Sequence, residues 1–416
     1  MRYVIIGNGI AGVEAAEAIR ALDVDSSITM VAVEPHPPYC RPMISLVLAG
    51  SARFEDLPIK GAHFYRRLAI DLVAREAVVS VSAADREVAT AGGGRIPYDR
   101  LLVATGSQPR GIEAAGSDLT GVFFLRTWDH ARGIVDALPG ARRALVAGGG
   151  LVGFKAAHGL LARGVPVTMV IKSGYPLSMQ VDAEAGRLIL EQLVAKGLDV
   201  RLGVDVTAFE GDSSGRVRQA LLSDGTRLEC DIAVIGKGVV PTMGFLPPEV
   251  KTRAAIVVDE HQETTVAGIY AAGDCAEGKD VARGKAWVNA IWPVGVEQGR
   301  IAGWNMAGRI VANPGGLSRN VIRIFDLDVM TAGVVNPNGE EPGLRSIMAG
   351  NRRLGLYRKL VLRGDVPVGM ALVNQIDEGG IMMRMIHEGR PLSGEQVERF
   401  LEGRLTLAQA VGPVGV

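Results

Sequence analysis

Three glycines near the amino terminus have a spacing that lets the backbone approach a phosphate group. Gly7, Gly9 and Gly12 form the pattern G-x-G-x-x-G directly after the apolar run of residues 3–6. The first glycine of such a motif permits a tight turn, the second lets the backbone approach a pyrophosphate, and the third lets the next helix pack on the strand. That helix, expected over 13–19, would offer free N–H groups and a partial positive charge at its amino end. The motif therefore predicts a dinucleotide-binding turn.

A carboxylate follows the first motif at the distance that this kind of fold requires. A second apolar run, residues 28–33, ends beside Glu34, roughly 20 residues after Gly12. A carboxylate at the end of the second strand can accept hydrogen bonds from both hydroxyls of an adenosine ribose. The competing interpretation is a glycine-rich turn followed by a surface glutamate, and one glycine motif alone does not exclude it.

The same pattern occurs a second time in the middle of the chain. Gly148, Gly150 and Gly153 follow the apolar run 144–147, and a helix is expected over 154–161. A duplicated motif is more specific than either copy alone. The sequence therefore predicts two dinucleotide folds and two bound dinucleotides.

Other patterns predict the elements that position these motifs. Prolines make residues 35–42 a constrained loop, and a helix is expected from about residue 43. A hairpin is expected around Gly364 and Asp365, and one or two short helices after Ser393. The remaining apolar or alternating runs predict strands at 78–82, 87–90, 101–104, 167–171 and 269–272 and a helix at 184–196.

These elements predict an α/β fold with two Rossmann-like three-layer dinucleotide-binding domains and a C-terminal α+β domain. Residues 1–112 and 254–318 are expected to form the first, discontinuous domain, because the strand at 269–272 returns to the first sheet. Residues 113–253 are expected to form the second domain, and 319–416 the C-terminal one.

Composition narrows the function classes. The 416 residues include 45 Lys and Arg against 45 Asp and Glu, so the charge balance indicates neither a nucleic acid nor an anionic membrane surface as partner. The cysteines Cys40, Cys230 and Cys275 are too few and too scattered for a disulfide framework or a metal site. The first strand leaves no room for a signal peptide, and no apolar run reaches the roughly 20 residues of a membrane helix. We expect a cytoplasmic protein without a metal site.

Several motifs together resemble one family. In chain order they are GNGIAG, YCRP, YDRLLVATGSQPR, GGGLVG, IYAAGDCAE, EQGRIAGWNMAG and YRKLVLRGDVPVGMALV. This order is similar to that of the FAD-dependent pyridine nucleotide–disulfide oxidoreductases, in the branch of rubredoxin and ferredoxin reductases and the flavin end of nitrite reductase large subunits. The resemblance covers nearly the whole chain.

The resemblance implies an FAD in the first fold. Glu34 would hold the adenosine, Arg41 and Pro42 would line the flavin, and Asp274 would accept a ribitol hydroxyl. Cys275 would pack near the ribityl chain. The full set of implied FAD-binding residues is Gly7, Gly9, Ile10, Ala11, Gly12, Glu34, Arg41, Pro42, Val78, Thr105, Gly106, Gly273 and Asp274.

The second fold would hold a nicotinamide dinucleotide, and here the chain departs from the family pattern. The implied residues are Gly148, Gly150, Gly153, Lys155 and Lys172. Leu46 stands where relatives often carry lysine, and Lys155 where they usually carry glutamate. Ile171 and Lys172 replace the acidic residue that usually ends the next strand. A cation there suits the 2′-phosphate of NADPH, but NADH and a site that has lost its ligand stay open.

The implied function is hydride exchange between FAD and NAD(P)H, with electron transfer to an iron–sulfur protein or subunit of the ferredoxin or rubredoxin kind. Hydride transfer requires no side-chain acid or base, so no catalytic residue is assigned. The alternatives are a relay subunit that holds FAD beside a degenerate nicotinamide site, and a thiol or peroxide reductase that uses Cys40. Cys230 is expected in a buried strand.

Overall fold

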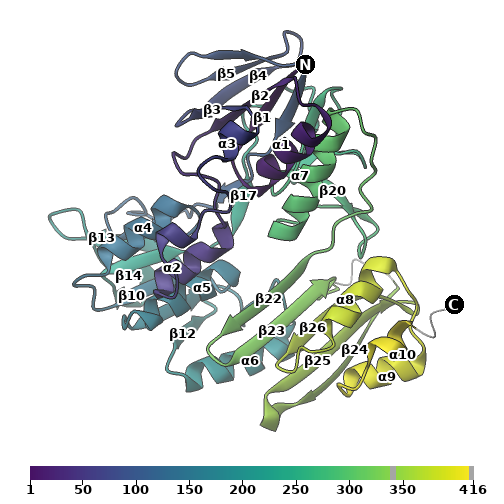
Figure 1. Cartoon of the computed structure of the whole chain (residues 1–416). Coiled ribbons are helices and arrows are strands. Elements are labelled where there is room, and N and C mark those ends of the chain that lie inside the picture. Colours follow the sequence, from purple (N-terminus) through teal and green to yellow (C-terminus); the bar gives the residue numbers. More distant parts are fainter. Residues whose placement is uncertain (338–342, 412–416) are drawn as a thin grey trace. The chain divides into compact units, whose positions relative to one another are not determined.

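The computed structural model describes residues 1–337 and 343–411. Its contacts divide the chain into two compact units, each assembled from separate stretches (Figure 1). The first contains residues 1–42, 55–108 and 239–318, and the second contains 43–54, 109–238 and the chain from 319 onward.

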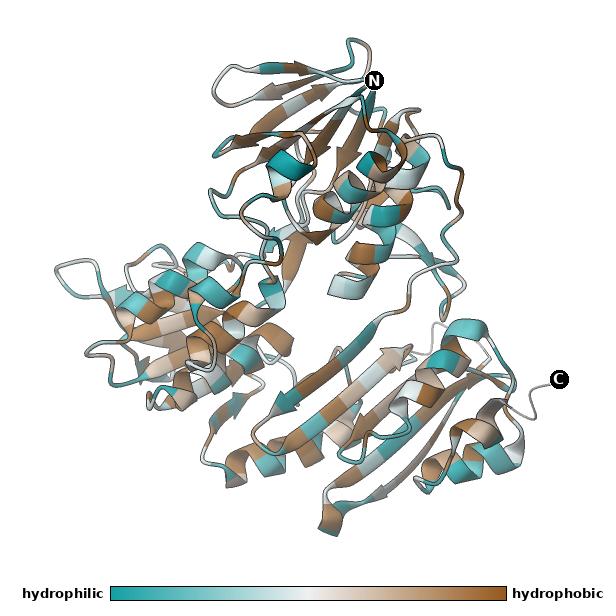
Figure 2. Ribbon diagram, in the orientation of Figure 1, coloured by the Kyte–Doolittle hydropathy of each residue, from teal (hydrophilic) through white to brown (hydrophobic). Residues whose placement is uncertain are grey.

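A five-stranded parallel sheet forms the centre of the first unit. Its order is β19-β7-β1-β2-β3. β1 is buried over four of its five residues, because its β-branched run has helices on one face and a smaller sheet on the other. Figure 2 shows the hydrophobic colouring of these central strands. The bounds are β1 Arg2–Ile6, β2 Ser27–Ala32, β3 Ile70–Ala74, β7 Arg100–Val103 and β19 Ile269–Ala271.

Helices α1 (Ile10–Leu22) and α7 (Trp292–Met306) pack closely in this unit because their contact surfaces carry small residues. A Cβ on Gly299 would lie 2.2 Å from the carbonyl oxygen of Ala11, and one on Gly303 would lie 2.5 Å from that of Ala15. The small residues therefore set the distance between the two helices.

Smaller elements complete the first unit. They are α3 Phe64–Arg67, the antiparallel sheet of β4 Val78–Ser82, β5 Glu87–Thr90 and β6 Arg95–Pro97, the sheet of β18 Ile256–Val257, β20 Ala276–Asp280 and β21 Lys285–Trp287, and the paired strands β8 Ser107–Pro109 and β17 Val239–Pro241.

The second unit contains another five-stranded parallel sheet, in the order β12-β11-β10-β16-β9. Its elements are β9 Val122–Phe124, α4 Trp128–Ala137, β10 Ala144–Ala147, α5 Leu151–Ala162, β11 Val167–Ile171, α6 Ala183–Ala195, β12 Asp199–Leu202 and β16 Ile232–Ile235, with an antiparallel sheet of β13 Val206–Gly211, β14 Val217–Leu222 and β15 Arg227–Glu229.

The short helix α2 (Ile44–Ala49) also belongs to the second unit, where it packs on α4 and α5. Arg163 donates hydrogen bonds to the carbonyl oxygens of Leu48 (2.9 Å) and Val47 (3.0 Å). The bond to Leu48 satisfies a carbonyl that the last turn of a helix leaves free, and Val47 gains a second donor beside the Gly50 N–H. The helix expected from residue 43 therefore forms, but its partners are helices of the second dinucleotide fold.

The C-terminal region carries an antiparallel sheet in the order β22-β23-β26-β25-β24. The hairpin expected at Gly364 and Asp365 joins β25 and β26. The bounds are β22 Arg319–Ile324, β23 Leu327–Gly333, β24 Leu344–Asn351, β25 Leu356–Arg363, β26 Val366–Val373, α8 Gly379–Glu388, α9 Gly394–Leu401 and α10 Leu407–Val411.

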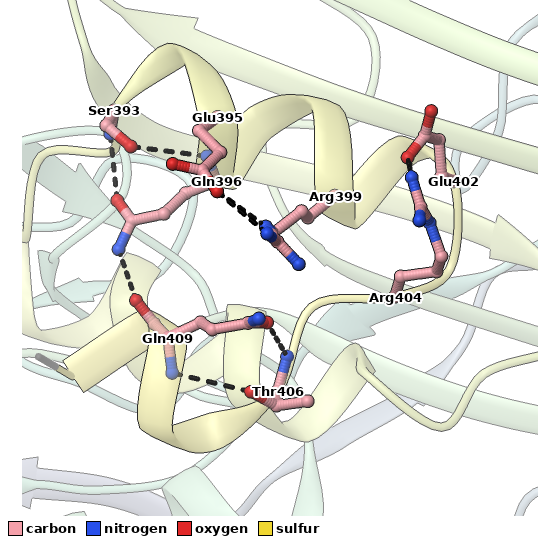
Figure 3. Close-up of polar contacts among 8 residues, drawn as sticks. All are labelled: Ser393, Glu395, Gln396, Arg399, Glu402, Arg404, Thr406 and Gln409. Atoms are coloured by element: carbon pink, nitrogen blue, oxygen red, sulfur yellow. Dashed lines mark hydrogen bonds and ion pairs between the residues drawn. The ribbon is translucent and has the colours of Figure 1, made fainter.

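Reciprocal hydrogen bonds fix the start of α9 (Figure 3). The Ser393 side chain accepts from the backbone N–H of Gln396, and the Gln396 side chain accepts from the Ser393 N–H, which is a capping box. The Gln396 amide also donates to the carbonyl oxygen of Gln409 at 2.6 Å. One side chain thus ties α9 to α10.

The predicted fold class is confirmed. The strands predicted at 78–82, 87–90, 144–147 and 167–171 have the predicted bounds. Cys230 is buried as expected but lies between β15 and β16 rather than within a strand. The division at 112, 253 and 318 into three domains stays a prediction.

Candidate functional site

In the first glycine turn, neighbouring backbone atoms crowd the first and third glycines of the motif, whereas the second glycine faces open space. Gly7 has a φ of +120°, and a Cβ there would lie 2.2 Å from the carbonyl oxygen of Ala104. A Cβ on Gly12 would lie 2.1 Å from the carbonyl oxygen of Gly7, whereas one on Gly9 would meet no atom within 4 Å. The turn therefore presents backbone to an open space at the amino end of α1, the helix that contains Ile10 and Ala11.

The second glycine turn repeats this geometry. Gly148 has a φ of +132°, and its Cβ would lie 2.3 Å from the carbonyl oxygen of Gly236. A Cβ on Gly153 would lie 2.1 Å from the carbonyl oxygen of Gly148, and one on Gly150 would meet no atom within 4 Å. Both turns thus leave room where a pyrophosphate would approach the backbone and the helix dipole.

Glu34 lies in a cluster with Tyr39 and Arg41. The Tyr39 hydroxyl donates to Glu34 Oε2 at 2.7 Å, and Arg41 pairs with Glu34 Oε1 and donates to the Tyr39 hydroxyl at 2.8 Å. Burial alone would lower the pKa of Arg41, but Tyr39 and Glu34 raise it above its ordinary value. Since a carboxylate has about four acceptor positions, Glu34 keeps capacity for ribose hydroxyls.

Asp274 follows β19, at the carboxyl edge of the first sheet. The hydroxyl of Ser107 donates to Asp274 Oδ2 at 2.8 Å. Asp274 is also among the charges that raise the pKa of Arg41. The structure therefore brings Glu34, Arg41 and Asp274 into one charged region of the first unit, as the carboxyl ends of parallel strands do.

Hydrogen bonds fix the loops beside Asp274. The hydroxyl of Thr105 donates to the carbonyl oxygen of Thr242 at 2.6 Å. The N–H of Thr242 donates in turn to the carbonyl oxygen of Gly106 at 3.1 Å. The Gly273 N–H donates to the side chain of Gln298 at 2.8 Å. The motifs predict Thr105, Gly106 and Gly273, but sequence analysis missed their partners Thr242 and Gln298, because these lie far away in the chain.

The two other implied FAD residues lie at different places in the first unit. Pro42 is exposed in the 3₁₀ turn Arg41–Met43. Val78 begins β4 and packs on the apolar cluster that contains Val4 and Ile6. Their contact with a flavin stays a prediction.

The second site lacks a carboxylate at the end of β11. Ile171 is 1 % exposed, and a Cβ on Gly149 would lie 2.6 Å from its Cγ2 atom. Lys172 is 78 % exposed, with Nζ 3.9 Å from a carboxylate oxygen of Asp205. Asp205 also pairs with Lys237. The sequence analysis singled out Lys172 but missed Asp205 and Lys237. Lys155 is half-buried on α5.

The three cysteines form no disulfide with one another. Burial raises the pKa of Cys230 to about 12 and also raises that of Cys275, whose thiol donates to the carbonyl oxygen of Val103 at 3.3 Å. Cys40 is half-buried. Within residues 1–337 and 343–411, no His, Cys, Asp and Glu side chains form a group that could hold a metal. Over the same ranges, no helix combines the length and apolar character that a membrane span requires.

Comparison with known proteins identifies similar chains. This chain is 32% identical over 397 residues to a nitrite reductase [NAD(P)H] from Bacillus subtilis, covering 94% of this chain and 48% of that one. It is 30% identical to the NADH-dependent phenylglyoxylate dehydrogenase subunit epsilon of Aromatoleum evansii, covering 92% and 91%. The chain spans about half the length of the first curated relatives that it matches.

Solved structures show the same fold. A ferredoxin reductase from Rhodopseudomonas palustris superposes with a TM-score of 0.85 at 24% identity, covering 98% of both chains. The model of the pyridine nucleotide-disulphide oxidoreductases matches residues 1–305. The resemblance predicted from the motifs is therefore confirmed, and the chain belongs to the pyridine nucleotide-disulphide oxidoreductase family.

Proposed function

We propose that this chain is an FAD-containing oxidoreductase that exchanges hydride with NAD(P)H and electrons with an iron–sulfur protein or subunit. The repeated geometry of the two glycine turns carries the proposal. In each turn, backbone atoms confine the first and third glycines of the motif, and the middle glycine faces open space. One chain with two such turns can hold two dinucleotides.

The residues of the first unit fit an FAD. The Gly9 turn offers backbone and a helix amino end to the pyrophosphate, Glu34 offers acceptors to the ribose, and Asp274 offers an acceptor to the ribityl chain. FAD bound there would supply hydride and single-electron chemistry, which side chains alone do not provide. The protein's part is to bind and orient the two dinucleotides.

Positive charge on the first unit supports an acidic electron-transfer partner. The hairpin of β20 and β21 carries Lys279, Arg283 and Lys285, and the exposed Trp287 lies under the Arg283 guanidinium at 4.1 Å. A cation and an exposed tryptophan are common anchors of protein interfaces. The similarity to one subunit of a phenylglyoxylate dehydrogenase supports a place within a larger complex.

A relay subunit with a degenerate nicotinamide site is the second candidate. The observation that favours it is the aliphatic end of β11, where Ile171 leaves no acceptor for a ribose hydroxyl. In either case we expect a cytoplasmic location, since the three cysteines form no disulfide with one another.

Rapid mixing of the oxidised protein with NADH or NADPH under anaerobic conditions tests the proposal. The expected result is loss of the flavin absorbance near about 450 nm, followed by its return when an oxidised ferredoxin is added. A flavin that neither nucleotide bleaches would contradict the proposed activity and would favour the relay subunit.

A further inference from the structure

The end of β11 is closed by aliphatic side chains. Ile171 packs over Gly149, and the N–H of Leu177 donates to the Gly149 carbonyl at 2.8 Å. Leu177 is fully buried, so the loop after β11 folds back on the glycine turn. In dinucleotide folds this strand end normally supplies the carboxylate that binds the ribose 2′-hydroxyl of NAD. Here it offers none.

A cluster of charged residues, Lys172, Asp205 and Lys237, lies at this edge. Lys237 and Lys172 both approach Asp205, with Lys237 in direct contact and Lys172 at 3.9 Å. Lys237 is 16 % exposed and Lys172 is 78 % exposed. The largely covered Lys237 therefore neutralises Asp205, and the exposed Lys172 gives the group its net positive charge.

Asp205 is held in place from several directions. Its Oδ1 accepts the Val206 N–H at 2.9 Å, and its own N–H donates to the hydroxyl of Ser223 at 3.1 Å. With these bonds and the Lys237 pair, the carboxylate cannot easily turn away from Lys172. It weakens the attraction of Lys172 for an anion and would repel one placed next to it.

We propose that the second site selects the 2′-phosphorylated dinucleotide NADP(H), with Lys172 binding the phosphate and Asp205 limiting its affinity. This inference rests on the proposed function, since it names the nucleotide of that site. A phosphate monoester carries about −1.5 to −2 charges at pH 7, and its hydrogen bonds to an ammonium are charge-assisted. A free 2′-hydroxyl gains neither contact.

Calorimetric titration of the oxidised holoprotein with 2′,5′-ADP and 5′-AMP tests this without turnover. The two probes differ only by the 2′-phosphate. The expected result is tighter binding of 2′,5′-ADP by about tenfold or more, with an advantage that shrinks as salt rises. Lys172→Gln should remove most of that advantage, and Asp205→Asn should increase it several-fold, while neither changes 5′-AMP binding.

Absent effects on 2′,5′-ADP binding, or a loss of 5′-AMP binding, would overturn the inference. Equal affinity for the two probes, or no effect of the exposed Lys172→Gln, would refute the phosphate site. Weaker 5′-AMP binding in Asp205→Asn would make Asp205 a ribose ligand and the site selective for NADH. Flavin bleaching by NADH alone would refute the inference and leave the proposed function standing. Tight 2′,5′-ADP binding, with no bleaching of the flavin by NADH or NADPH, would refute the proposed function and leave the phosphate site standing.

Discussion

At the scale of single residues, Gly9 and Gly150 differ from the other motif glycines because their missing side chains face open space. Their φ values of −84° and −91° suit any residue. A glutamate at either position should fold normally but place a carboxylate where a pyrophosphate would lie. We expect Gly9→Glu to yield colourless protein, and Gly150→Glu to keep its flavin but lose bleaching by nicotinamide nucleotides.

Absorbance spectra of the two variants measure flavin content and bleaching, and thermal melts check that both variants fold. Each variant is the control for the other. Loss of flavin from Gly150→Glu with retention by Gly9→Glu would reverse the assignment of the two sites. Equal loss from both, with normal melting, would contradict separate sites.

Two buried tyrosines predict a loss of stability at high pH. Burial, with smaller contributions from Asp23 and Glu263 respectively, raises the pKa of Tyr3 and of Tyr270 to about 12. Because the unfolded pKa is about 10, the neutral form is favoured in the folded state. The contribution of each tyrosine to the free energy of unfolding is complete below pH 10 and is lost as the pH rises towards 12.

Urea unfolding between pH 8 and pH 11.5 measures this effect. We expect the free energy of unfolding to fall by about 1–2 kcal/mol per tyrosine across that range. Tyr270→Phe should flatten part of the curve, since it removes one of the buried groups whose pKa is raised in the folded state; the buried thiols Cys230 and Cys275 and other buried tyrosines contribute in the same direction. An unchanged slope in that variant would assign the alkaline loss to other groups.

At the scale of elements, the contact of α1 with α7 depends on Gly299. Its Cβ would meet the backbone of Ala11 at 2.2 Å, whereas that of Gly295 would lie 3.2 Å from the Ile10 side chain and, at ordinary contact distance, 3.9 Å from the Cα of Gly273. Backbone cannot give way as a side-chain methyl can, so Gly299→Ala should destabilise the fold by about 2–3 kcal/mol and Gly295→Ala by less than about 1 kcal/mol.

Flavin retention adds a second measurement, because α1 begins at the Gly9 turn. Gly299→Ala should release FAD more readily than Gly295→Ala during dialysis. Equal stability and equal retention in the two variants would show that α7 does not set the position of α1.

Elements with strong local patterns could be predicted from the sequence, but their side-chain partners could not. The buried strand of residues 144–147 and its glycine turn follow from local composition. The Asp205–Lys237 pair joins two loops that meet only when β12 and β16 take their places in one sheet. Likewise, α2 is predictable as a helix, but its packing on α5 depends on contacts far along the chain. Local propensity carries no information on such pairs.

At the scale of the whole molecule, the chain passes repeatedly between its two units, and each unit has its own glycine turn. A ligand stabilises the structure that binds it, by about 2.7 kcal/mol at a concentration of 100 Kd. Protection from hydrogen exchange should therefore divide along the units. FAD should slow exchange near Gly9, Gly106 and Asp274, and 2′,5′-ADP should slow it near Gly150 and Lys172.

Comparing apoprotein, FAD-loaded protein and FAD-loaded protein with 2′,5′-ADP separates these effects. The hairpin of β25 and β26 lies outside both sites and is the internal control. Because each glycine turn closes on carbonyl oxygens of its own unit, Ala104 in one and Gly236 in the other, each ligand should order its own sheet edge. Protection of both turns by FAD alone would mean that the two sites are energetically coupled, in which case 2′,5′-ADP must in turn strengthen FAD binding by the same factor.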